Sequence, residues 1–180
     1  HRATEDFDGS RPAAHWYRKS QKSAWPPKPI AKAQEAKVPP AEPPSGRETY
    51  MGRTIAQTMH WRGAEWLMRK TREDEEHTRR LLEALNLTPG LTVCDLGCGN
   101  GYHALPIAER VGGDGMVFGV DIQQPMLAML KRRQVKRGLD NIQLIHNTVA
   151  SPDLPERSCD LILMVDVYHE FSHPVLMLSG

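Results

Sequence analysis

The sequence has no run of apolar residues that approaches the roughly 20 needed for a helix to cross a bilayer. It also lacks an excess of charge, because 23 Lys and Arg residues stand against 22 Asp and Glu residues and leave a formal net charge of +1. Such a balance gives no electrostatic reason to expect a nucleic acid as the partner. We therefore expect neither a membrane span nor a nucleic-acid partner.

Cysteine is equally scarce. Cys94, Cys98 and Cys159 are odd in number and form no C-x-x-C pair, and two of them fall in or beside expected core strands. We therefore expect reduced thiols. We also expect a cytoplasmic protein, with export as the alternative, because the chain starts with His1 and a removed leader would leave no trace.

Composition divides the chain into three parts. Residues 1–46 are rich in Pro, Ala and Lys and have no sustained apolar period, which predicts a disordered or extended tail. Residues 47–88 are rich in helix formers and predict a helical segment. Residues 89–180 alternate short apolar runs with amphipathic stretches, which predicts a doubly wound, mostly parallel α/β sheet. Four strands fit, so we expect the core to be incomplete at its C-terminal end.

Two features stand out in the front segment. Thr71 followed by Asp74 is typical of a capping box and predicts that a helix begins there. Pro89-Gly90 then ends this helix. An apolar stripe on it, which would face the next element, consists of Leu81, Leu82 and Leu85.

Aromatic residues precede that helix. Trp61, Trp66 and Met68 lie at helical spacing, which favours a helix packed against the sheet. The alternative is a lid over a ligand pocket, for which Arg53 and His60 would be candidate contacts. Both interpretations place this segment next to the sheet.

The sharpest motif, D-L-G-C-G-N-G, stands where an expected strand ends and a helix begins. Its glycines, Gly97, Gly99 and Gly101, allow a tight turn and a close approach of the backbone to a ligand. Asp95 opens the motif at the carboxyl edge of the sheet, where a carboxylate suits a cationic ligand better than a pyrophosphate. Asp121 ends the next expected strand and is placed to accept hydrogen bonds from a ribose diol.

The dinucleotide fingerprint G-x-G-x-x-G would need a glycine at the position of Tyr102. The stretch instead resembles the E/D-x-G-x-G-x-G motif of class I (Rossmann-like) S-adenosylmethionine-dependent methyltransferases, and the agreement extends over roughly residues 92–174. The resemblance implies S-adenosylmethionine as the cofactor, with the glycine loop against its methionyl part and Asp121 on its ribose. The expected cofactor contacts are Asp95, Gly97, Cys98, Gly99, Gly101, Asp121, Ile122, Asn147, Thr148 and Asp166.

The third expected strand fits this family less well. Members often place an Asp shortly after it to bind the adenine amino group, whereas this chain has Asn147 and Thr148. Either could stand in for the acid. Gln123, Gln124 and Met126 are candidates for the walls of the adenine pocket, with ordinary packing or solvent exposure as the alternative.

The segment His169-Glu170-Phe171-Ser172-His173 matches the H-E-x-x-H zinc pattern. Two histidines in this pattern bind zinc together only when they lie on one face of a helix. Here the segment directly follows an expected strand, and Pro174 disfavours a helical conformation at His173. We therefore predict no metal site.

In the family that the chain resembles, the stretch after the fourth strand borders the sulfonium and the acceptor. Asp166 and Tyr168 would then line the cofactor site, and His169 and Glu170 are the candidate catalytic residues that could orient or deprotonate an acceptor. Alignment matters more than a base for a good nucleophile. The N/D-P-P-Y motif of many amino-group methyltransferases is absent here, which disfavours DNA-adenine and glutamine-amide acceptors.

These patterns predict a methyltransferase that uses S-adenosylmethionine and a small-molecule acceptor. The alternatives are an NAD(P)-dependent α/β oxidoreductase and a non-catalytic cofactor-binding or interaction module. The first alternative requires a pyrophosphate on the helix end beside Asp95 and Tyr102. The second requires binding without turnover.

Overall fold

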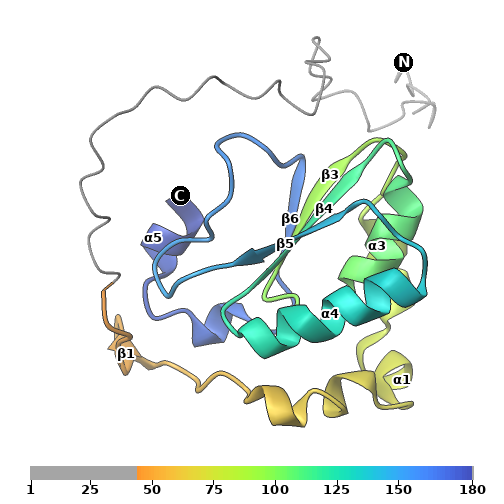
Figure 1. The fold of residues 1–180 in the computed structure, drawn as a ribbon. Coiled ribbons are helices and arrows are strands. Elements are labelled where there is room, and N and C mark those ends of the chain that lie inside the picture. Colours follow the sequence, from red (N-terminus) through yellow and green to blue (C-terminus); the bar gives the residue numbers. More distant parts are fainter. Residues whose placement is uncertain (1–43, 180) are drawn as a thin grey trace, which may run out of the picture. The chain divides into compact units, whose positions relative to one another are not determined.

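The computed structural model describes residues 44–179, so almost all of the predicted tail, residues 1–46, lies outside the described part (Figure 1). The centre of the fold is a sheet of four parallel strands in the order β5-β4-β3-β6. The predicted doubly wound α/β fold is therefore confirmed. The strands are β3 (Thr92–Leu96), β4 (Met116–Asp121), β5 (Ile142–His146) and β6 (Leu161–Leu163).

The two neighbours of β3 pair with it over different lengths. β4 pairs along all of β3, from Thr92 opposite Met116 to Leu96 opposite Val120. β6 pairs only with the middle of β3 and is much shorter than the apolar run that predicts it. Asp166 has a φ of 54°, so the chain turns away soon after β6. All four strands present their carboxyl ends at one edge of the sheet.

Helices cover both faces of the sheet. Val93 and Val117 point into a core shared with α2, α3 and α4, whereas Cys94 and Phe118 point into a second core that includes α5 (Figure 1). Among residues 44–179, no helix combines the length and the apolar character that crossing a membrane requires. The helices are α2 (Thr78–Ala84), α3 (Ala104–Val111), α4 (Gln124–Lys136) and α5 (Pro174–Ser179).

The front segment begins with a short antiparallel hairpin. Its turn residues, Met51 and Gly52, both have a positive φ, as a type I′ turn requires. Short helical pieces follow and lead to the first strand of the main sheet. The elements are β1 (Thr49–Tyr50), β2 (Arg53–Thr54), the 3-10 turns η1 (Trp61–Gly63) and η2 (Trp66–Met68), and α1 (Arg72–Glu76).

The capping-box pattern at Thr71 predicts one helix, but His77 divides it into α1 and α2. α1 begins where expected, although the Thr71 side chain makes no capping hydrogen bond. His77 adopts a left-handed conformation with a φ of 49°. The Glu73 carboxylate then accepts hydrogen bonds from the Arg79 N–H at 3.2 Å and from the Thr78 hydroxyl. This carboxylate caps the start of α2 and stabilises the break.

Trp66 and Met68 are not core residues, so the predicted helix packed against the sheet is wrong at these positions. They are 53% and 40% exposed, and they form a 3-10 turn too short to have a buried face. The Arg69 guanidinium covers the Trp66 ring at 3.7 Å from its centroid. Of the predicted leucine stripe, Leu82 is buried and both of its partners pack against the same core.

Candidate active site

A cavity of about 330 Å³ lies over the carboxyl ends of the parallel strands. One side is built from the glycine loop after β3 and the turns after β4 and β5, and the other from the front segment and η3 (Tyr168–Glu170). This is the edge at which open α/β sheets bind ligands. The predicted site residues that line it are Asp95, Gly97, Cys98, Gly99, Asp121, Ile122, Asn147, Thr148, Asp166, His169 and Glu170.

Two glycines of the loop leave no room for a side chain. Gly97 has a φ of 80°, and a Cβ there would lie 2.4 Å from a methyl carbon of Val167. Gly101 has a φ of 86°, and a Cβ there would lie 2.2 Å from a methyl carbon of Leu130 on α4. Gly101 does not line the cavity. It allows the loop to pack against α4, while Gly97 allows the Val167 side chain to pack against the loop.

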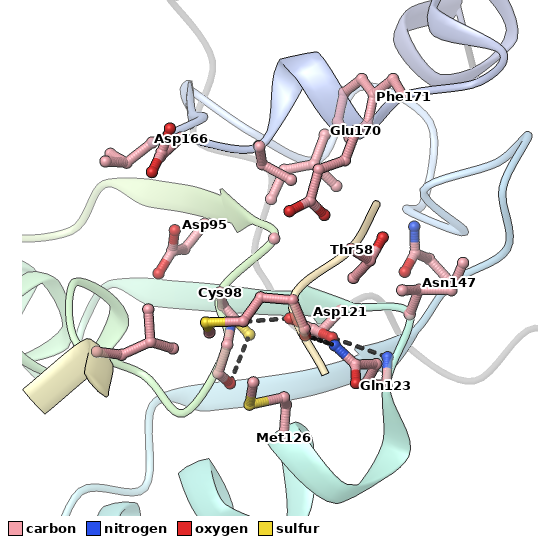
Figure 2. Close-up of a pocket in the computed structure, with 18 of the residues that line it drawn as sticks. Thr58, Asp95, Cys98, Asp121, Gln123, Met126, Asn147, Asp166, Glu170 and Phe171 are labelled. Carbon is pink, nitrogen blue, oxygen red and sulfur yellow. Dashed lines mark hydrogen bonds between the residues drawn. The ribbon is translucent and has the colours of Figure 1, made fainter. Parts of the chain in front are cut away.

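Asp121 is held by two backbone groups at the end of β4. Its Oδ2 accepts a hydrogen bond from the Gly99 N–H at 2.8 Å, and its Oδ1 accepts one from the Gln123 N–H at 2.8 Å (Figure 2). The second bond fixes the turn between β4 and α4. Burial raises the pKa of the Asp121 carboxyl, and the two N–H groups oppose that rise. Each carboxylate oxygen has more than one lone pair, so Asp121 can still accept further hydrogen bonds.

Asp95 lies at the end of β3 and is 3% exposed. The Ala104 N–H at the start of α3 bonds its carboxyl group, but among residues 44–179 its Oδ2 atom has no hydrogen-bond partner. Burial raises the pKa of Asp95 to about 7, and the nearby Asp121 contributes to that rise. An unpaired buried oxygen costs free energy. This atom therefore points to a ligand that brings a donor.

Asn147, after β5, is also buried with one free polar atom. Its Nδ2 donates to the Thr148 carbonyl at 3.1 Å, which orients the amide and leaves Oδ1 unpartnered within the described residues. The Thr148 hydroxyl is already used, because it accepts a hydrogen bond from the Ser151 N–H at 3.1 Å. The residues predicted as walls of the adenine pocket lie in different places. Met126 is buried in the cavity wall, whereas Gln124 is exposed and lies outside the cavity.

We call residues 55–61 the strap, because they cross the cavity and contribute side chains to its lining. Its first six residues form no helix or strand. The Gln123 side chain holds it at one end: Nε2 donates to the Met59 carbonyl at 2.8 Å, and Oε1 accepts from the Trp61 N–H at 2.9 Å. Gln123, a predicted adenine wall, therefore also ties the strap to α4. The strap residues that line the cavity are Gln57, Thr58 and Met59.

The backbone of η3 holds the other end of the strap. The Ala56 N–H donates to the His169 carbonyl at 3.0 Å. The same carbonyl accepts a hydrogen bond from Arg53 Nη1 at 2.6 Å, and the Arg53 guanidinium lies 5.7 Å from the centre of the Tyr168 ring. Tyr168 packs against Phe171 and does not line the cavity. Arg53 and Tyr168 therefore anchor the strap outside the cavity.

His169 and Glu170 occupy different environments. The His169 side chain is 48% exposed, and its Nδ1 lies 3.6 Å from an oxygen of Asp166, whose side chain is 75% exposed. These two residues form the rim of the cavity. The Glu170 carboxylate points into the cavity (Figure 2). Its burial raises its pKa, although hydrogen bonds from the Thr58 side chain and the Met59 backbone oppose that rise.

The two histidines of the H-E-x-x-H pattern do not share a helix face. η3 ends at Glu170 and α5 begins at Pro174, so His173 lies between two elements. His173 is buried, and its Nδ1 shares a hydrogen bond with the Ser172 hydroxyl at 3.0 Å. In the part of the chain that the structure describes, no group of three or more metal-binding side chains comes together.

Among the buried charged and imidazole side chains of the cavity, sequence reasoning missed Arg72 and His103, which are each 5% exposed. Arg72 stands at the start of α1 and has the appearance of an ordinary residue in a charged helix. His103 lies two residues beyond the last glycine of the motif. No periodic pattern marks either position, because the contacts that bury them come from distant segments.

Residues 93–178 match the family described as a methyltransferase domain. An aklanonic acid methyltransferase from a Streptomyces species is 39% identical over 85 residues, which cover 47% of this chain and 39% of that protein. A nocamycin O-methyltransferase from Saccharothrix syringae is 38% identical over 84 residues, which cover 47% of this chain and 30% of that protein. The chain thus spans less than half the length of these relatives.

A solved structure gives the same result for the fold. The crystal structure of a S-adenosylmethionine-dependent methyltransferase from Aquifex aeolicus matches with a TM-score of 0.64 and 26% sequence identity. The match covers 68% of this chain and 65% of that chain. It therefore extends beyond the residues matched by the family comparison.

Proposed function

The chain carries a class I S-adenosylmethionine-dependent methyltransferase domain, and we propose that it transfers a methyl group from that cofactor to a small-molecule acceptor. The observation that carries the proposal is the pair of buried carboxylates beside the glycine loop. Asp95 offers an unpaired oxygen to an ammonium group, and Asp121 offers lone pairs to a ribose diol.

Other residues of the cavity fit the remaining parts of the cofactor. The backbone of Gly97 lines the cavity, and the absence of a Cβ there lets Val167, another lining residue, pack against the loop. Asn147 presents its free amide oxygen, the kind of acceptor that an adenine amino group needs. Met126 and Ile122 supply apolar wall on the side of Asn147. Asp166 adds negative charge at the rim, which favours a cationic sulfonium over its neutral product.

The bound cofactor supplies a methyl group on a positively charged sulfur, an activated leaving group that chiefly requires an acceptor in line. Of the two candidate catalytic residues, Glu170 has the geometry to take the proton of an acceptor hydroxyl, because its carboxylate points into the cavity. Its raised pKa brings it closer to the range of an effective general base. His169, half-exposed beside Asp166, would orient the acceptor at the rim.

A small acceptor is favoured by the size of the cavity and by the relatives. The cavity of about 330 Å³ has the size of a small-molecule site, and strap residues contribute to its lining. The names of the two relatives denote methyltransferases for aklanonic acid and nocamycin, which are small molecules. The two comparisons cover 39% and 30% of those proteins, so they support the acceptor class and not an individual acceptor.

Calorimetric titration with S-adenosylmethionine, S-adenosylhomocysteine and NAD tests the cofactor assignment. We expect saturable binding of both adenosyl ligands and no binding of NAD. Asp121→Asn should weaken binding of S-adenosylhomocysteine by roughly tenfold or more, because charge-assisted hydrogen bonds to the ribose are lost. Asp114→Asn, an exposed acid in the loop before β4, is the matched control and should bind like the wild type.

The other outcomes separate the alternatives. Binding of NAD alone would overturn the proposal in favour of an oxidoreductase. Tight binding of the adenosyl ligands without turnover of any compound in a broad acceptor screen would favour a cofactor-binding module instead.

A further inference from the structure

A group of buried polar side chains meets at one end of the cavity, around Asp95. Arg72 opens α1, His103 immediately precedes α3, and Asp95 ends β3. All three line the cavity and are at least 95% buried, with exposures of 5%, 5% and 3%. Arg72 and His103 both contact the Tyr102 ring, and the positive charge of Arg72 lowers the pKa of both Asp95 and His103. Three segments of the chain therefore bring one cation, one imidazole and one carboxyl group together.

The His103 ring is buried and lacks a hydrogen-bond partner in the described part of the chain. Among residues 44–179, neither Nδ1 nor Nε2 has a hydrogen bond, although both atoms are buried. Burial lowers the pKa of His103 to about 4, and the positive charge of Arg72 adds to this effect. The ring is therefore neutral at pH 7 and a poor base, with one N–H to donate. Leaving this donor unpaired costs free energy, so a ligand acceptor is expected beside it.

Arg72 is held in place by its neighbours. Its Nε donates to Glu76 at 2.8 Å, and its Nη1 donates to the Leu67 carbonyl at 2.9 Å. Its guanidinium stacks 4.1 Å from the centre of the Tyr102 ring, which also contacts the His103 ring edge-on with centroids 5.1 Å apart. A guanidinium has five N–H groups, so donors remain beyond these two bonds. Arg72 is thus preorganised to receive an anion.

We propose that Arg72 and His103 bind the carboxylate of the cofactor's methionyl group, while Asp95 binds its ammonium group. This inference rests on the proposed function. The amino-acid end of S-adenosylmethionine carries one positive and one negative group on the same carbon. Here one cavity presents the opposite arrangement: an Asp95 oxygen without a partner among the described residues, and a guanidinium and an imidazole N–H that both lie against the Tyr102 ring. The site therefore selects for an intact amino acid on the adenosyl ligand.

The test compares S-adenosylhomocysteine with its decarboxylated analogue, which keeps the ammonium group and lacks the carboxylate. For the wild type, calorimetry should show that loss of the carboxylate weakens binding by roughly 10-fold to 100-fold, as expected for charge-assisted hydrogen bonds. His103→Phe and Arg72→Gln should weaken S-adenosylhomocysteine and leave the analogue nearly unchanged. Asp95→Asn is the matched control and should weaken both ligands equally, because both carry the ammonium group.

Each other result has a definite meaning. If the wild type binds the two ligands equally well, or if both His103→Phe and Arg72→Gln weaken them by the same factor, the carboxylate assignment is overturned while the proposed function stands. Failure of the folded wild type to bind any adenosyl ligand overturns the proposed function itself. Because Arg72→Gln removes the Glu76 and Leu67 contacts, thermal unfolding of each variant must show a folded protein. Should Arg72→Gln not fold, His103→Phe alone decides the question.

Discussion

Asp121 and Asp95 are both buried carboxyl groups, but they differ in what their oxygen atoms contact. Both oxygens of Asp121 accept backbone hydrogen bonds, so its position is set before any ligand arrives. Asp95 keeps one oxygen unpaired, as Asn147 does in the turn after β5. Residues that are already bonded define the shape of the cavity, whereas those with a free polar atom have most to gain from a ligand.

Glu170 gives the first prediction at this scale. Glu170→Gln keeps the size of the side chain but removes its ability to take a proton, so kcat for a hydroxyl acceptor should fall roughly 100-fold. The Kd for S-adenosylhomocysteine should change little. Initial rates and calorimetry on the same preparation would separate the two effects. Glu156→Gln, at an exposed acid outside the cavity, is the control, and an equal loss of kcat in that variant would argue against Glu170 as the proton acceptor.

At the scale of the elements, the strap is the least supported part of the cavity wall. Residues 55–60 have no helical or strand hydrogen bonding, and a few bonds to Gln123 and to the backbone of η3 hold the strap. Segments with so few contacts open at low free-energy cost. Since the strap covers the proposed cofactor site, its opening should govern how fast the ligand enters and leaves.

The Gln123 side chain provides the test of this idea. Gln123→Ala removes two hydrogen bonds to the strap, so the opening equilibrium should rise roughly 10-fold or more. Amide hydrogen exchange in residues 55–61 should accelerate by that factor, and dissociation of S-adenosylhomocysteine should accelerate with it. Gln124→Ala, at the exposed next position, is the control. Faster exchange across the whole sheet would instead mean that the substitution lowers global stability.

Elements also decide how much could be predicted. The positions of the glycine loop and Asp121 at the cavity could be predicted from the sequence. Both follow strands of a parallel sheet, and the carboxyl ends of such strands meet at one edge. The break at His77 could not be predicted, because it depends on the Glu73 side chain reaching forward to cap α2. The exposure of Trp66 and the burial of Arg72 could not be predicted for a related reason. Their positions depend on tertiary contacts of short helical pieces, which leave no periodic signal.

At the scale of the whole molecule, Asp95 and His103 make opposite contributions to stability. The folded protein holds the Asp95 proton up to pH about 7, whereas the unfolded chain loses it near the ordinary Asp pKa of 3.8. The free energy of unfolding from this group therefore falls as pH rises between those values. The folded protein binds a proton at His103 only below pH about 4, against 6.5 when unfolded, so this contribution rises with pH. In the wild type the two slopes largely cancel.

Single substitutions should expose each slope. Asp95→Asn removes the falling contribution, so its free energy of unfolding relative to the wild type should increase from pH 4 to pH 7 by about 3 kcal/mol. His103→Phe removes the contribution that rises with pH. Its free energy of unfolding relative to the wild type should therefore be highest near pH 4, and this difference should vanish above pH 6.5. Urea unfolding at half-unit intervals of pH would measure both.

Binding of the cofactor should favour the ionised form of Asp95, whereas burial in the free protein favours the protonated form. An ammonium group beside the free oxygen favours the ionised carboxyl, so ligand binding near pH 6 must release a proton that the free protein holds. Calorimetry in buffers of different ionisation enthalpy should therefore report the release of up to one proton per S-adenosylhomocysteine in the wild type and close to none in Asp95→Asn. The affinity of the wild type should accordingly rise with pH up to about 7 and then level off, because above the pKa of Asp95 the carboxylate is already formed. A proton count that is the same in both proteins would place the ammonium group elsewhere in the cavity.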